Sequence, residues 1–479
     1  MPIRLYNSLT RSLQDLEPRT PGVVTMYHCG PTVYSSPHIG NFRSFLFADV
    51  LRRFVEDQGY RVQQVMNVTD VGHLTNDDIE SGEDKMEAAS RKTGLTAWDI
   101  AKKYEAEFHD CQHKLFVRLP HHMPRATEYI AQMGAIIDDL LQKGVAYQTN
   151  GNVYFEVARF PGYGKLSGKV LEELEAGARV AVNEEKKDPR DFALWKVDPK
   201  HQMQWDAPFR GGVRGFPGWH IECSAMSMQL LGPQIDVHTG GEDNMFPHHE
   251  CEIAQTEAHT GKPFVTIWMH ARHLLVDGTK MSKSLGNFFT VADILGKGYS
   301  GLELRYALVR VQYRQALNFT LKGLDEARAA IQRVQQCRQR LVRVRDGLDR
   351  AGADDLAAAC SSANAAFTSA MQDDLNVSGA LAAVFDFVAV ANKAPVSVAG
   401  AKAALAVFAR AEDVLACFGP EPKADATSEA PAELLALLEQ RKAAKKNKDF
   451  AAADRLRDQI AAAGWKIVDA PTGARLERT

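Results

Sequence analysis

The first hundred residues alternate between two kinds of hydrophobic pattern. Short runs rich in β-branched and aromatic residues at 23–28 and 60–68 flank a run with helical spacing at 45–54, and Gly59 follows that run. Strand, helix and strand in this order predict a βαβ unit on a parallel sheet, and glycine commonly follows a helix C-terminus. The pattern returns as a helix over 219–231, a strand over 235–239, a helix from 247 and a strand over 265–270. The sequence therefore predicts two halves of one α/β sheet.

Three other segments depart from this pattern. Residues 125–205 combine a helical run, a hairpin-like run and a stretch rich in Glu, Lys and Asp, which predicts an insertion into the sheet domain. After Leu304 the chain is rich in alanine, and its apolar residues recur at helical spacing, which predicts a helical bundle. Residues 418–432 are rich in Pro and Ala and indicate a linker to a last small module.

Composition narrows the class of protein without deciding its function. Of the 479 residues, 45% are hydrophobic and 24% charged, as in an ordinary globular protein. No run approaches the ~18 to 20 apolar residues of a membrane helix, and no signal peptide is evident, so we expect a cytoplasmic protein without a membrane partner. The formal net charge of -3 gives no general attraction to a polyanion, so a nucleic acid would have to bind local basic surfaces.

One group of candidate residues lies between the first predicted strand and helix. The segment Cys29-Gly30-Pro31-Thr32 is followed by Pro37-His38-Ile39-Gly40-Asn41. A helix N-terminus at this place binds phosphate because its first amides are unpaired. His38 can donate to a phosphate oxygen in a nucleotidyl transition state, and Gly40 lets an adenine ring approach the backbone. Taken alone, the triplet is a weak signal, and an ordinary turn is the favoured interpretation.

A second candidate is the loop Lys280-Met281-Ser282-Lys283-Ser284-Leu285-Gly286-Asn287, which follows a predicted strand. Two lysines three residues apart among small residues suit a clamp on a triphosphate, where their ammonium groups meet the charge that grows on the leaving pyrophosphate. By composition alone the loop is an ordinary solvated one. Its pairing with the His38 segment at the other end of the same sheet favours the phosphate interpretation.

A third candidate is a metal site. The seven cysteines are an odd number in a chain without a secretory signal, which indicates a reducing compartment and makes any special cysteine a metal ligand or a nucleophile. Cys29 ends a strand, Cys223 lies on a helix, and His248 and Glu252 share one helix face at i and i+4. Two thiolates, an imidazole and a carboxylate form a permitted tetrahedral zinc site. Spacing leaves Cys251 open as the fourth ligand, and the cysteines could also be buried small residues.

Five stretches, together with the two motifs above, resemble the cysteinyl-tRNA synthetases, a family of class I aminoacyl-tRNA synthetases. They are Met26 to Tyr34 (MYHCGPTVY), Gly218 to Met226 (GWHIECSAM), Phe246 to Gln255 (FPHHECEIAQ), Met281 to Phe288 (MSKSLGNF) and Tyr313 to Thr320 (YRQALNFT). The likeness continues through residues 371–376 to the C-terminal tail. The resemblance selects Glu252 as the fourth zinc ligand.

The resemblance implies an enzyme that activates L-cysteine with ATP and Mg²⁺, releases pyrophosphate, and esterifies the 3′ end of tRNA(Cys). It implies one Zn²⁺ per chain, which separates cysteine from serine because a thiolate is a far better zinc ligand than a hydroxyl. We expect a monomer. The implied roles are catalysis by His38, Lys280 and Lys283, ATP binding by His38, Gly40, Asn41 and Lys283, amino-acid binding by Gly30, Thr69, Trp219 and Asp243, and metal binding by Cys29, Cys223, His248 and Glu252.

The resemblance also implies a Rossmann-like parallel-sheet catalytic domain with an insertion, then an α-helical bundle and a small C-terminal module. The expected boundaries are 21–124 and 206–280 for the split catalytic domain, 125–205 for the insertion, 281–322 for the segment that carries the lysine loop, 323–418 for the tRNA-binding bundle, 419–432 for a linker, and 433–479 for the anticodon-binding module. The chain departs from the family at Asn41, where a second histidine is common. It also departs after Thr69, where a longer acidic stretch to Glu87 replaces a short Asp-Asp-Lys sequence. His73, which lies in this second region, has no assigned role.

Basic clusters in the C-terminal half are the candidate nucleic-acid contacts. They are Arg328, Arg333, Arg338, Arg340, Arg343 and Arg345 on one predicted helix, and Arg441, Lys442, Lys445, Lys446 and Lys448 in the tail, where Trp465 is a candidate stacking surface. Such runs are often only solvated faces. Two other functions stay open: a cysteine ligase that uses a small amino-sugar acceptor, and a non-catalytic RNA-binding paralogue. The roughly 150 residues after Arg314 argue against the first, and the retained lysines, His38 and four ligands argue against the second.

Overall fold

A computed structural model describes residues 2–72, 74–76, 81–169, 185–282, 285–424, 432–447, 449–470 and 473–478. The chain forms two compact units. The first comprises Met1–Gln335, Ala357–Lys393 and Ala406–Pro420, and the second comprises Gln336–Leu356, Ala394–Leu405 and Glu421–Thr479. All candidate catalytic, substrate-binding and metal-binding residues belong to the first unit.

The first unit is built on a parallel sheet with the strand order β12-β11-β3-β4. Its strands are β3 (Val23–His28), β4 (Arg61–Met66), β11 (Ile235–Gly241) and β12 (Val265–Ala271). β11 is buried along nearly its whole length, as expected for a sheet that is covered on both faces. Val237 on β11 lies in register with Met26 on β3, which confirms that two separated halves of the sequence form one sheet.

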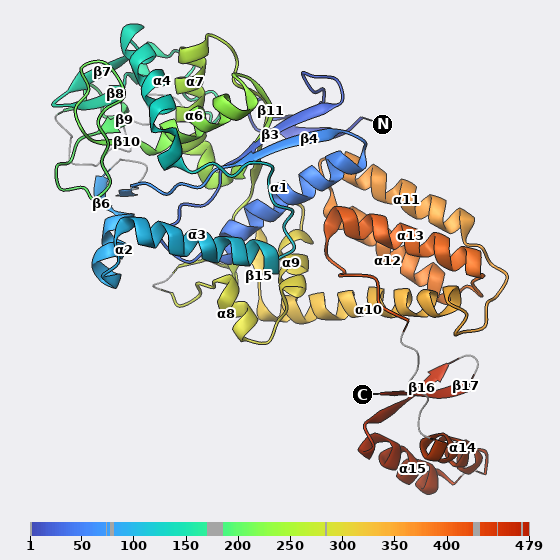
Figure 1. Cartoon of the computed structure of the whole chain (residues 1–479). Helices are drawn as coiled ribbons and strands as arrows, with labels where there is room; N and C mark the ends of the chain where they lie inside the picture. Colours follow the sequence, from blue (N-terminus) through green and yellow to red (C-terminus); the bar gives the residue numbers. More distant parts are fainter. Residues whose placement is uncertain are drawn as a thin grey trace. The chain divides into compact units, whose positions relative to one another are not determined.

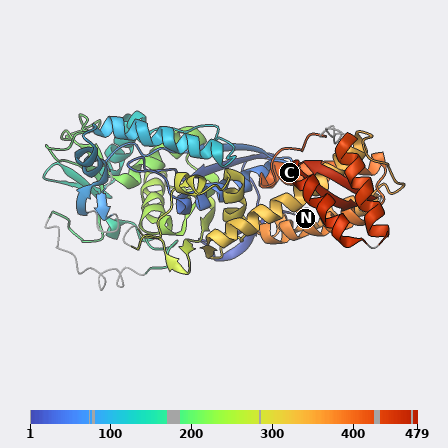
Figure 2. The ribbon, with the colours of Figure 1, turned by 90° about the horizontal axis from the view of Figure 1, so that it is seen from below.

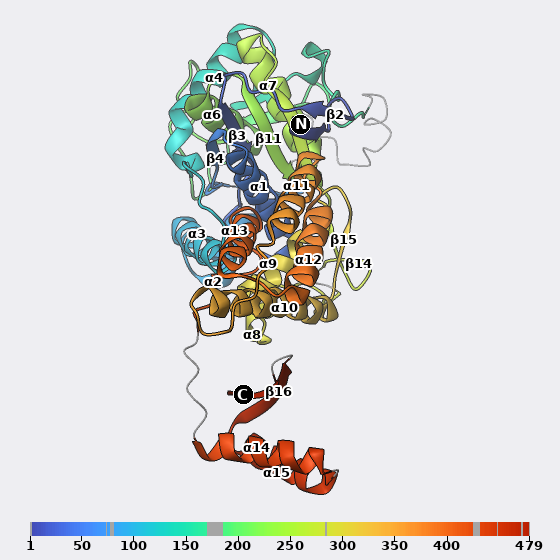
Figure 3. The same cartoon turned by 90° about the vertical axis from the view of Figure 1, so that its right-hand side faces the viewer.

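Helices cover both faces of this sheet (Figures 1 and 3). α1 (Ile39–Asp57) packs on one face, whereas α6 (Trp219–Leu231) and α7 (Glu250–Thr260) pack on the other. α1 connects β3 to β4 and α7 connects β11 to β12, so the two connections run in opposite directions along the sheet. Ligands of such sheets bind at the carboxyl ends of the strands where the direction reverses. Cys29 follows β3 and Asp243 follows β11, so both residues lie at that point.

Smaller elements surround the sheet. An N-terminal hairpin, β1 (Arg4–Asn7) with β2 (Ser12–Asp15), packs against β12. The segment after β4 forms β5 (Leu74–Asn76), β6 (Ser81–Asp84), α2 (Lys85–Thr93) and α3 (Ala97–Lys114). His73 and residues 77–80 of the acidic stretch lie outside the described residues.

The segment between the sheet halves has its own antiparallel sheet, with the order β10-β9-β8-β7. Its elements are η2 (Ala126–Tyr129), α4 (Ile130–Gln142), β7 (Ala146–Thr149), β8 (Asn152–Phe155), η3 (Val157–Arg159), β9 (Phe192–Lys196) and β10 (Phe216–Pro217). This sheet continues past residue 205, because β10 pairs with β9. Much of the acidic and basic stretch expected in this segment, residues 170–184, lies outside the described residues.

A third sheet and a series of helices follow β12. β13 (Leu274–Val276) pairs with β14 (Thr279–Lys280) and with β15 (Leu317–Phe319), and α8 (Val291–Gly296) and α9 (Gly301–Val309) lie between them in sequence. The long helices are α10 (Leu321–Arg345), which is continuous in Figure 2, α11 (Ala357–Gln372), α12 (Val377–Lys393) and α13 (Val398–Leu415). Leu324, Val334 and Leu341 on α10 are buried, as their helical spacing predicts. Within the described parts of the chain, none of the helices is long and apolar enough to cross a membrane.

The C-terminal elements have a hydrophobic cluster of their own. They are α14 (Ala432–Lys446), α15 (Phe450–Ala462), β16 (Trp465–Ala470) and β17 (Gly473–Arg478). Trp465 is 8% exposed and packs with Leu434, Leu438, Ile460 and Leu476. The prediction that Trp465 stacks on a base is therefore wrong, because so small a core needs its largest apolar side chain. Arg441 is also buried, whereas Lys442 and Lys446 are exposed; Lys448 lies outside the described residues.

Candidate active site

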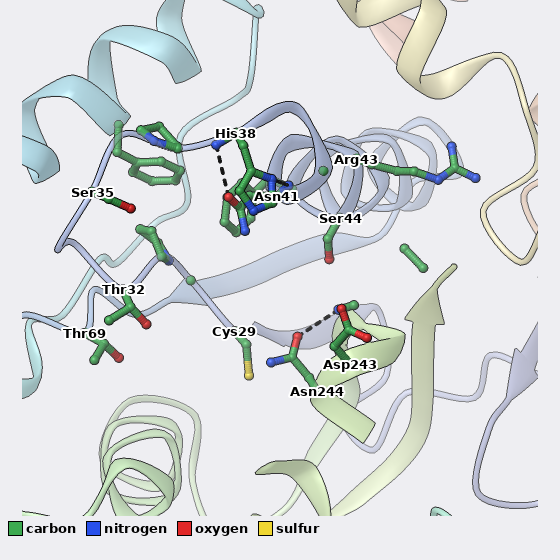
Figure 4. A pocket seen from close by; sticks show the side chains of 18 of the residues that line it. Cys29, Thr32, Ser35, His38, Asn41, Arg43, Ser44, Thr69, Asp243 and Asn244 are labelled. Carbon is green, nitrogen blue, oxygen red and sulfur yellow. Dashed lines mark hydrogen bonds between the residues drawn. The ribbon is translucent and has the colours of Figure 1, made fainter. Parts of the chain in front are cut away.

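A cavity of about 420 Å³ opens at the carboxyl edge of the parallel sheet. It is lined by the loops after β3 and β11, the start of α1, the start of α6, and the segment around β14 (Figure 4). The structure brings together here all candidate site residues except two: Glu252 lies behind the lining, and Lys283 lies outside the described residues. Those that line the cavity are Cys29, Gly30, His38, Gly40, Asn41, Thr69, Trp219, Cys223, Asp243, His248 and Lys280.

His38 and Asn41 form the N-terminal cap of α1. His38 Nδ1 accepts a hydrogen bond from the Asn41 amide at 3.2 Å, and Asn41 Oδ1 accepts one from the His38 amide at 3.1 Å. A neutral His38 ring therefore carries its proton on Nε2, which is the nitrogen that can donate to a phosphate. A Cβ at Gly40 would lie 3.0 Å from the His38 ring, so glycine keeps that ring in place. Asn41, at the position where a second histidine is common, thus supplies a side-chain contact to the His38 backbone.

The lysine loop begins on β14. Lys280 is exposed at the end of this strand and lines the cavity. Asn287 joins the two ends of the loop, because its Oδ1 accepts from the Ser282 amide at 2.8 Å and its Nδ2 donates to the Lys280 carbonyl at 3.2 Å. Lys283 and Ser284 lie outside the described residues. Asn287 stood in the quoted motif, but the sequence alone assigned it no role.

The four residues expected to bind the amino acid lie in different surroundings. Gly30 approaches the next strand so closely that a Cβ would lie 1.7 Å from the Asn67 carbonyl oxygen, and its amide donates to Asn67 Oδ1 at 2.8 Å. Thr69 Oγ1 donates to Glu222 Oε2 at 2.7 Å. The Trp219 ring stacks on His248 with the ring centroids 4.2 Å apart. Asp243 follows β11 at the opposite wall of the cavity from Thr69 (Figure 4).

Four candidate metal ligands gather at the floor of the cavity, where three line it and Glu252 lies directly behind them. One donor atom from each of Cys29, Cys223, His248 and Glu252 lies within 4.8 Å of the other three. They come from the end of β3, from α6, from the turn η5 (Met245–His249) and from α7. All four residues are buried, and His248 Nε2 lies 3.1 Å from Glu252 Oε1. Two sulfurs, one nitrogen and one oxygen are a donor set that suits tetrahedral zinc.

A second set shares two of these residues. Cys29, His238, His249 and Glu252 also bring their donor atoms within 4.8 Å of one another. Cys29, Cys223 and His248 line the cavity, whereas His238 and His249 do not, so an ion in the first set is the one that can meet a substrate. Cys251 belongs to neither set among the described residues, and its Sγ lies 3.4 Å from the Tyr163 hydroxyl.

The donor groups on the cavity floor shift one another's pKa values. Burial raises the pKa of the Cys223 thiol, but its hydrogen bond with Cys29 and the neighbouring His248 outweigh burial and lower that pKa to about 6. Burial lowers the pKa of His248, but the Cys223 sulfur raises it to about 10. Glu252 has a pKa of about 2 despite burial, because His238 and His248 face its carboxylate. Negative charge is thus stabilised on Cys223 and Glu252, whereas burial and the neighbouring Cys223 raise the pKa of the Cys29 thiol.

Sequence reasoning missed the residues that hold these donors from behind. His238 Nε2 lies 2.9 Å from Glu252 Oε2, and His249 Nε2 lies 3.1 Å from Cys29 Sγ. Glu222, which is fully buried, bonds to Thr69, and burial raises its pKa well above the usual value. His249 and Glu222 stood in the quoted stretches FPHHECEIAQ and GWHIECSAM, but nothing local showed which face of each helix they occupy.

Family models match three parts of the chain. The class I (C) tRNA synthetase catalytic domain matches residues 15–329, the DALR domain matches residues 366–419, and the cysteinyl-tRNA ligase anticodon binding domain matches residues 427–472. The chain is 42% identical to the cysteine–tRNA ligase of Chlorobium luteolum and 43% identical to that of Thermus thermophilus, in each case over 100% of both chains. It is also 42% identical to the cysteine–tRNA ligase of Caldicellulosiruptor saccharolyticus, over 99% of this chain and 100% of that one.

Solved structures share the fold at much lower identity. Mycobacterium tuberculosis methionyl-tRNA synthetase in complex with methionyl-adenylate aligns with a TM-score of 0.61 at 15% identity, over 82% of this chain and 92% of that chain. A putative arginyl-tRNA synthetase from Campylobacter jejuni aligns with a TM-score of 0.56 at 13% identity, over 84% and 93%. The chain thus has the fold of the class I tRNA synthetases. Within that class, the chain belongs to the cysteine–tRNA ligase family.

Proposed function

We propose that the chain activates L-cysteine with ATP and Mg²⁺ to cysteinyl-adenylate and then esterifies the 3′ end of tRNA(Cys). The observation that carries this proposal is one cavity with two chemically different ends. Its floor holds sulfur, nitrogen and oxygen donors suited to a soft cation, and its rim holds His38 and Lys280, which suit phosphate. A reaction that joins a thiol-bearing amino acid to a nucleotide needs both ends of the cavity at once.

Zinc is the metal that we propose for the floor, held by Cys29, Cys223, His248 and Glu252. Zinc bound there supplies a soft Lewis acid that prefers the thiolate of cysteine to the hydroxyl of serine. Shape alone could not separate two side chains that differ by sulfur for oxygen. His238 and His249 orient Glu252 and Cys29 from behind, as outer partners of metal ligands do.

The other residues position the reacting groups. Asp243 meets the ammonium of the amino acid. Trp219 packs beside the amino acid, and its ring also holds His248 by stacking. Thr69 and Gly30 complete the wall on the opposite side. The substrate carboxylate oxygen forms a bond to the α-phosphorus of ATP, and the bond from that phosphorus to the β-phosphate bridging oxygen breaks, so pyrophosphate leaves with Mg²⁺. His38, Lys280 and Lys283 stabilise the charge that develops, and Gly40 and Asn41 support His38.

For tRNA we propose the bundle at 323–418 and the module at 433–479. The arginines of α10 support this role less than their number suggests, because Arg328 pairs with Glu303, Arg343 pairs with Asp349 and Arg345 pairs with Glu421. Lys442 likewise pairs with Glu439, whereas Lys445 and Lys446 on α14 are exposed and better placed to neutralise phosphates. We assign the linking segment 281–322 and the insertion 125–205 to the catalytic part of the chain and not to tRNA binding. We also propose a cytoplasmic monomer.

The two other functions are less well supported. A ligase with an amino-sugar acceptor has no use for the matched DALR and anticodon-binding regions. A non-catalytic RNA-binding paralogue would have no need for both the donor cluster and the phosphate groups around one cavity.

The proposal is tested by pyrophosphate exchange with cysteine and with serine, combined with aminoacylation of tRNA(Cys) and metal analysis. We expect exchange with cysteine that is at least about 100-fold faster than with serine, since binding to a hydroxyl loses the metal contact. Exchange without transfer to tRNA would favour a different acceptor. Absence of exchange from a metal-loaded, folded chain would refute the proposed enzyme.

A further inference from the structure

The acidic stretch up to Glu87, which sequence reasoning left unassigned, contains Lys85, the first residue of α2. Lys85 lines the same cavity as His38 and Lys280. Its Nζ lies 5.5 Å from the centre of the Tyr34 ring, which belongs to the loop between Cys29 and His38. A lysine from a different part of the chain therefore reaches the wall of the proposed active site.

The residues on either side of Lys85 are anchored. Asp84 is 6% exposed and caps α2, because its Oδ1 accepts from the Glu87 amide at 2.9 Å. The other Asp84 oxygen lies 3.5 Å from Nε2 of His201, which is also buried. Met86 is fully buried in a cluster with Val33, Val68 and Ile100. The backbone at Lys85 is thus held on both sides, while its side chain remains partly exposed at the cavity wall.

The start of α2 packs closely against Gly72. A Cβ on Gly72 would lie 2.7 Å from Asp84 Oδ2 and 2.7 Å from His201 Nε2. Gly72 follows Thr69, which lies in the cavity, so the strand end that carries Thr69 and the start of α2 are in direct contact. The first turn of α2, which carries Lys85, is therefore packed against the segment that follows Thr69.

Two arginines that line the cavity make contacts within the protein. The Arg43 guanidinium donates to the carbonyls of Leu308 at 2.8 Å and of Gln315 at 2.7 Å. Arg272 lies 3.4 Å from Glu242, which also contacts His273. Among the described residues, Lys280 and Lys85 are the lysines that line the cavity, and they come from segments far apart in the sequence. An ammonium is a compact charge that suits a phosphate oxygen.

We infer that Lys85 binds a phosphate group of a substrate in this cavity, as a further contact beside His38 and Lys280. This inference rests on the proposed function, which brings two phosphate-bearing substrates to the cavity: the triphosphate of ATP and the terminal nucleotides of tRNA. Both present the same charged oxygens. The contact is a charge-assisted hydrogen bond, which is stronger than a neutral one.

The test compares Lys85→Met, which removes the charge but keeps most of the length, with Lys85→Arg, which keeps the charge. Lys92→Met, at an exposed position in the last turn of the same helix, is the matched control. One assay measures the ATP dependence of pyrophosphate exchange with cysteine and without tRNA. A second assay measures transfer from preformed cysteinyl-adenylate to tRNA.

We expect Lys85→Met to lower kcat/KM for ATP, or the rate of transfer, by about tenfold or more, since a charge-assisted contact is lost. A loss in exchange identifies ATP as the source of the phosphate, and a loss confined to transfer identifies tRNA. Lys85→Arg should recover most of the rate, Lys92→Met should match the unaltered chain, and the KM for cysteine should not change.

Several outcomes would overturn the inference. Rates of Lys85→Met within about twofold of the unaltered chain in both assays would do so, as would an arginine variant as impaired as the methionine variant. A lower thermal midpoint with equal loss of every parameter would mean that Lys85 supports the fold alone. If the unaltered chain shows no exchange with cysteine, the proposed function fails; if that exchange is normal and Lys85→Met is also normal, the inference about Lys85 alone fails.

Discussion

The two ends of the active-site cavity are built in opposite ways. At the floor, Cys223, His248 and Glu252 are at most 1% exposed and come from separate elements of the sheet domain. At the rim, His38 is half-buried and Lys280 is exposed, and each stands in a short contiguous motif. The floor is held by contacts between segments far apart in sequence, whereas the rim is organised by local caps and a loop.

This difference matches what each end has to recognise. Selection of sulfur over oxygen needs donors held in one geometry away from water, where electrostatic interactions are strongest. A triphosphate must enter, and pyrophosphate must leave, so the groups that bind it have to be reachable from solvent. The floor should therefore respond to mutation in an all-or-none manner and the rim by degrees.

The largest effect should come from the floor. Cys223→Ser should lose bound zinc and cysteine activation together, and because even outer partners of a metal site are worth about 10- to 100-fold, loss of a ligand should exceed 100-fold. Metal content by mass spectrometry and pyrophosphate exchange give the two readouts. Cys251→Ser is the matched control, since Cys251 is a buried cysteine one residue before Glu252 but outside the donor sets. Full zinc and activity in Cys223→Ser would show that the metal site is misassigned.

A smaller, graded effect is expected at the rim. Lys280→Ala, and likewise Lys283→Ala, should lower kcat for exchange by about 10²-fold and leave the KM for cysteine nearly unchanged, because the lysines meet charge that develops in the transition state. Lys262→Ala, an exposed lysine beyond α7 and outside the cavity lining, should have no effect. An unchanged kcat in both loop variants would show that the lysines at the rim do not stabilise the transition state.

Neither end of the cavity should depend on the C-terminal module. Removal of residues 425–479 should leave cysteine activation within about twofold but lower aminoacylation at limiting tRNA by about tenfold, since Lys442, Lys445 and Lys446 are lost. Each lost phosphate contact should reduce the slope of log affinity against log salt by about 0.9. Exchange and aminoacylation rates and tRNA affinity at two salt concentrations provide the measurement. Equal loss of both activities would mean that the module supports the fold instead.

The smallest expected effect concerns the buried pair of His201 and Asp84, which lies near the rim of the cavity. Burial lowers the pKa of His201, but the Asp84 carboxylate and the Met203 carbonyl outweigh burial and raise it above 6.5. A raised histidine pKa stabilises the fold fully below the unfolded pKa of about 6.5, and this stabilisation is lost as pH rises through the folded pKa. The substitution His201→Gln should therefore lower the free energy of unfolding by about 1 kcal/mol at pH 6 and by less at pH 9.

Urea unfolding followed by circular dichroism at the two pH values measures this difference. His113→Gln, at an exposed position in the last turn of α3, is the control and should change the free energy of unfolding less than His201→Gln does at pH 6. A His201→Gln penalty that does not depend on pH would contradict a charged His201.

The sequence alone predicted much of the fold and the residue types of the site. The strand–helix–strand order over 23–68 and the elements between 219 and 270 follow from hydrophobic periodicity, which is a local property. The pairing of His248 with Glu252 follows from i and i+4 spacing on a helix, and the His38 and Lys280 motifs are contiguous. Local spacing and local motifs were enough for each of these.

Tertiary structure decided which side chains meet. It placed Glu252, and not Cys251, beside Cys29, because that choice depends on the face that α7 turns toward the sheet. It buried Trp465 in a core and paired Arg328 with Glu303, since a side chain's exposure depends on what packs against it. It also brought Lys85 to the cavity through contacts of its two neighbours with His201 and Val68. Such contacts join segments far apart in the chain, and local periodicity carries no information about which segments meet.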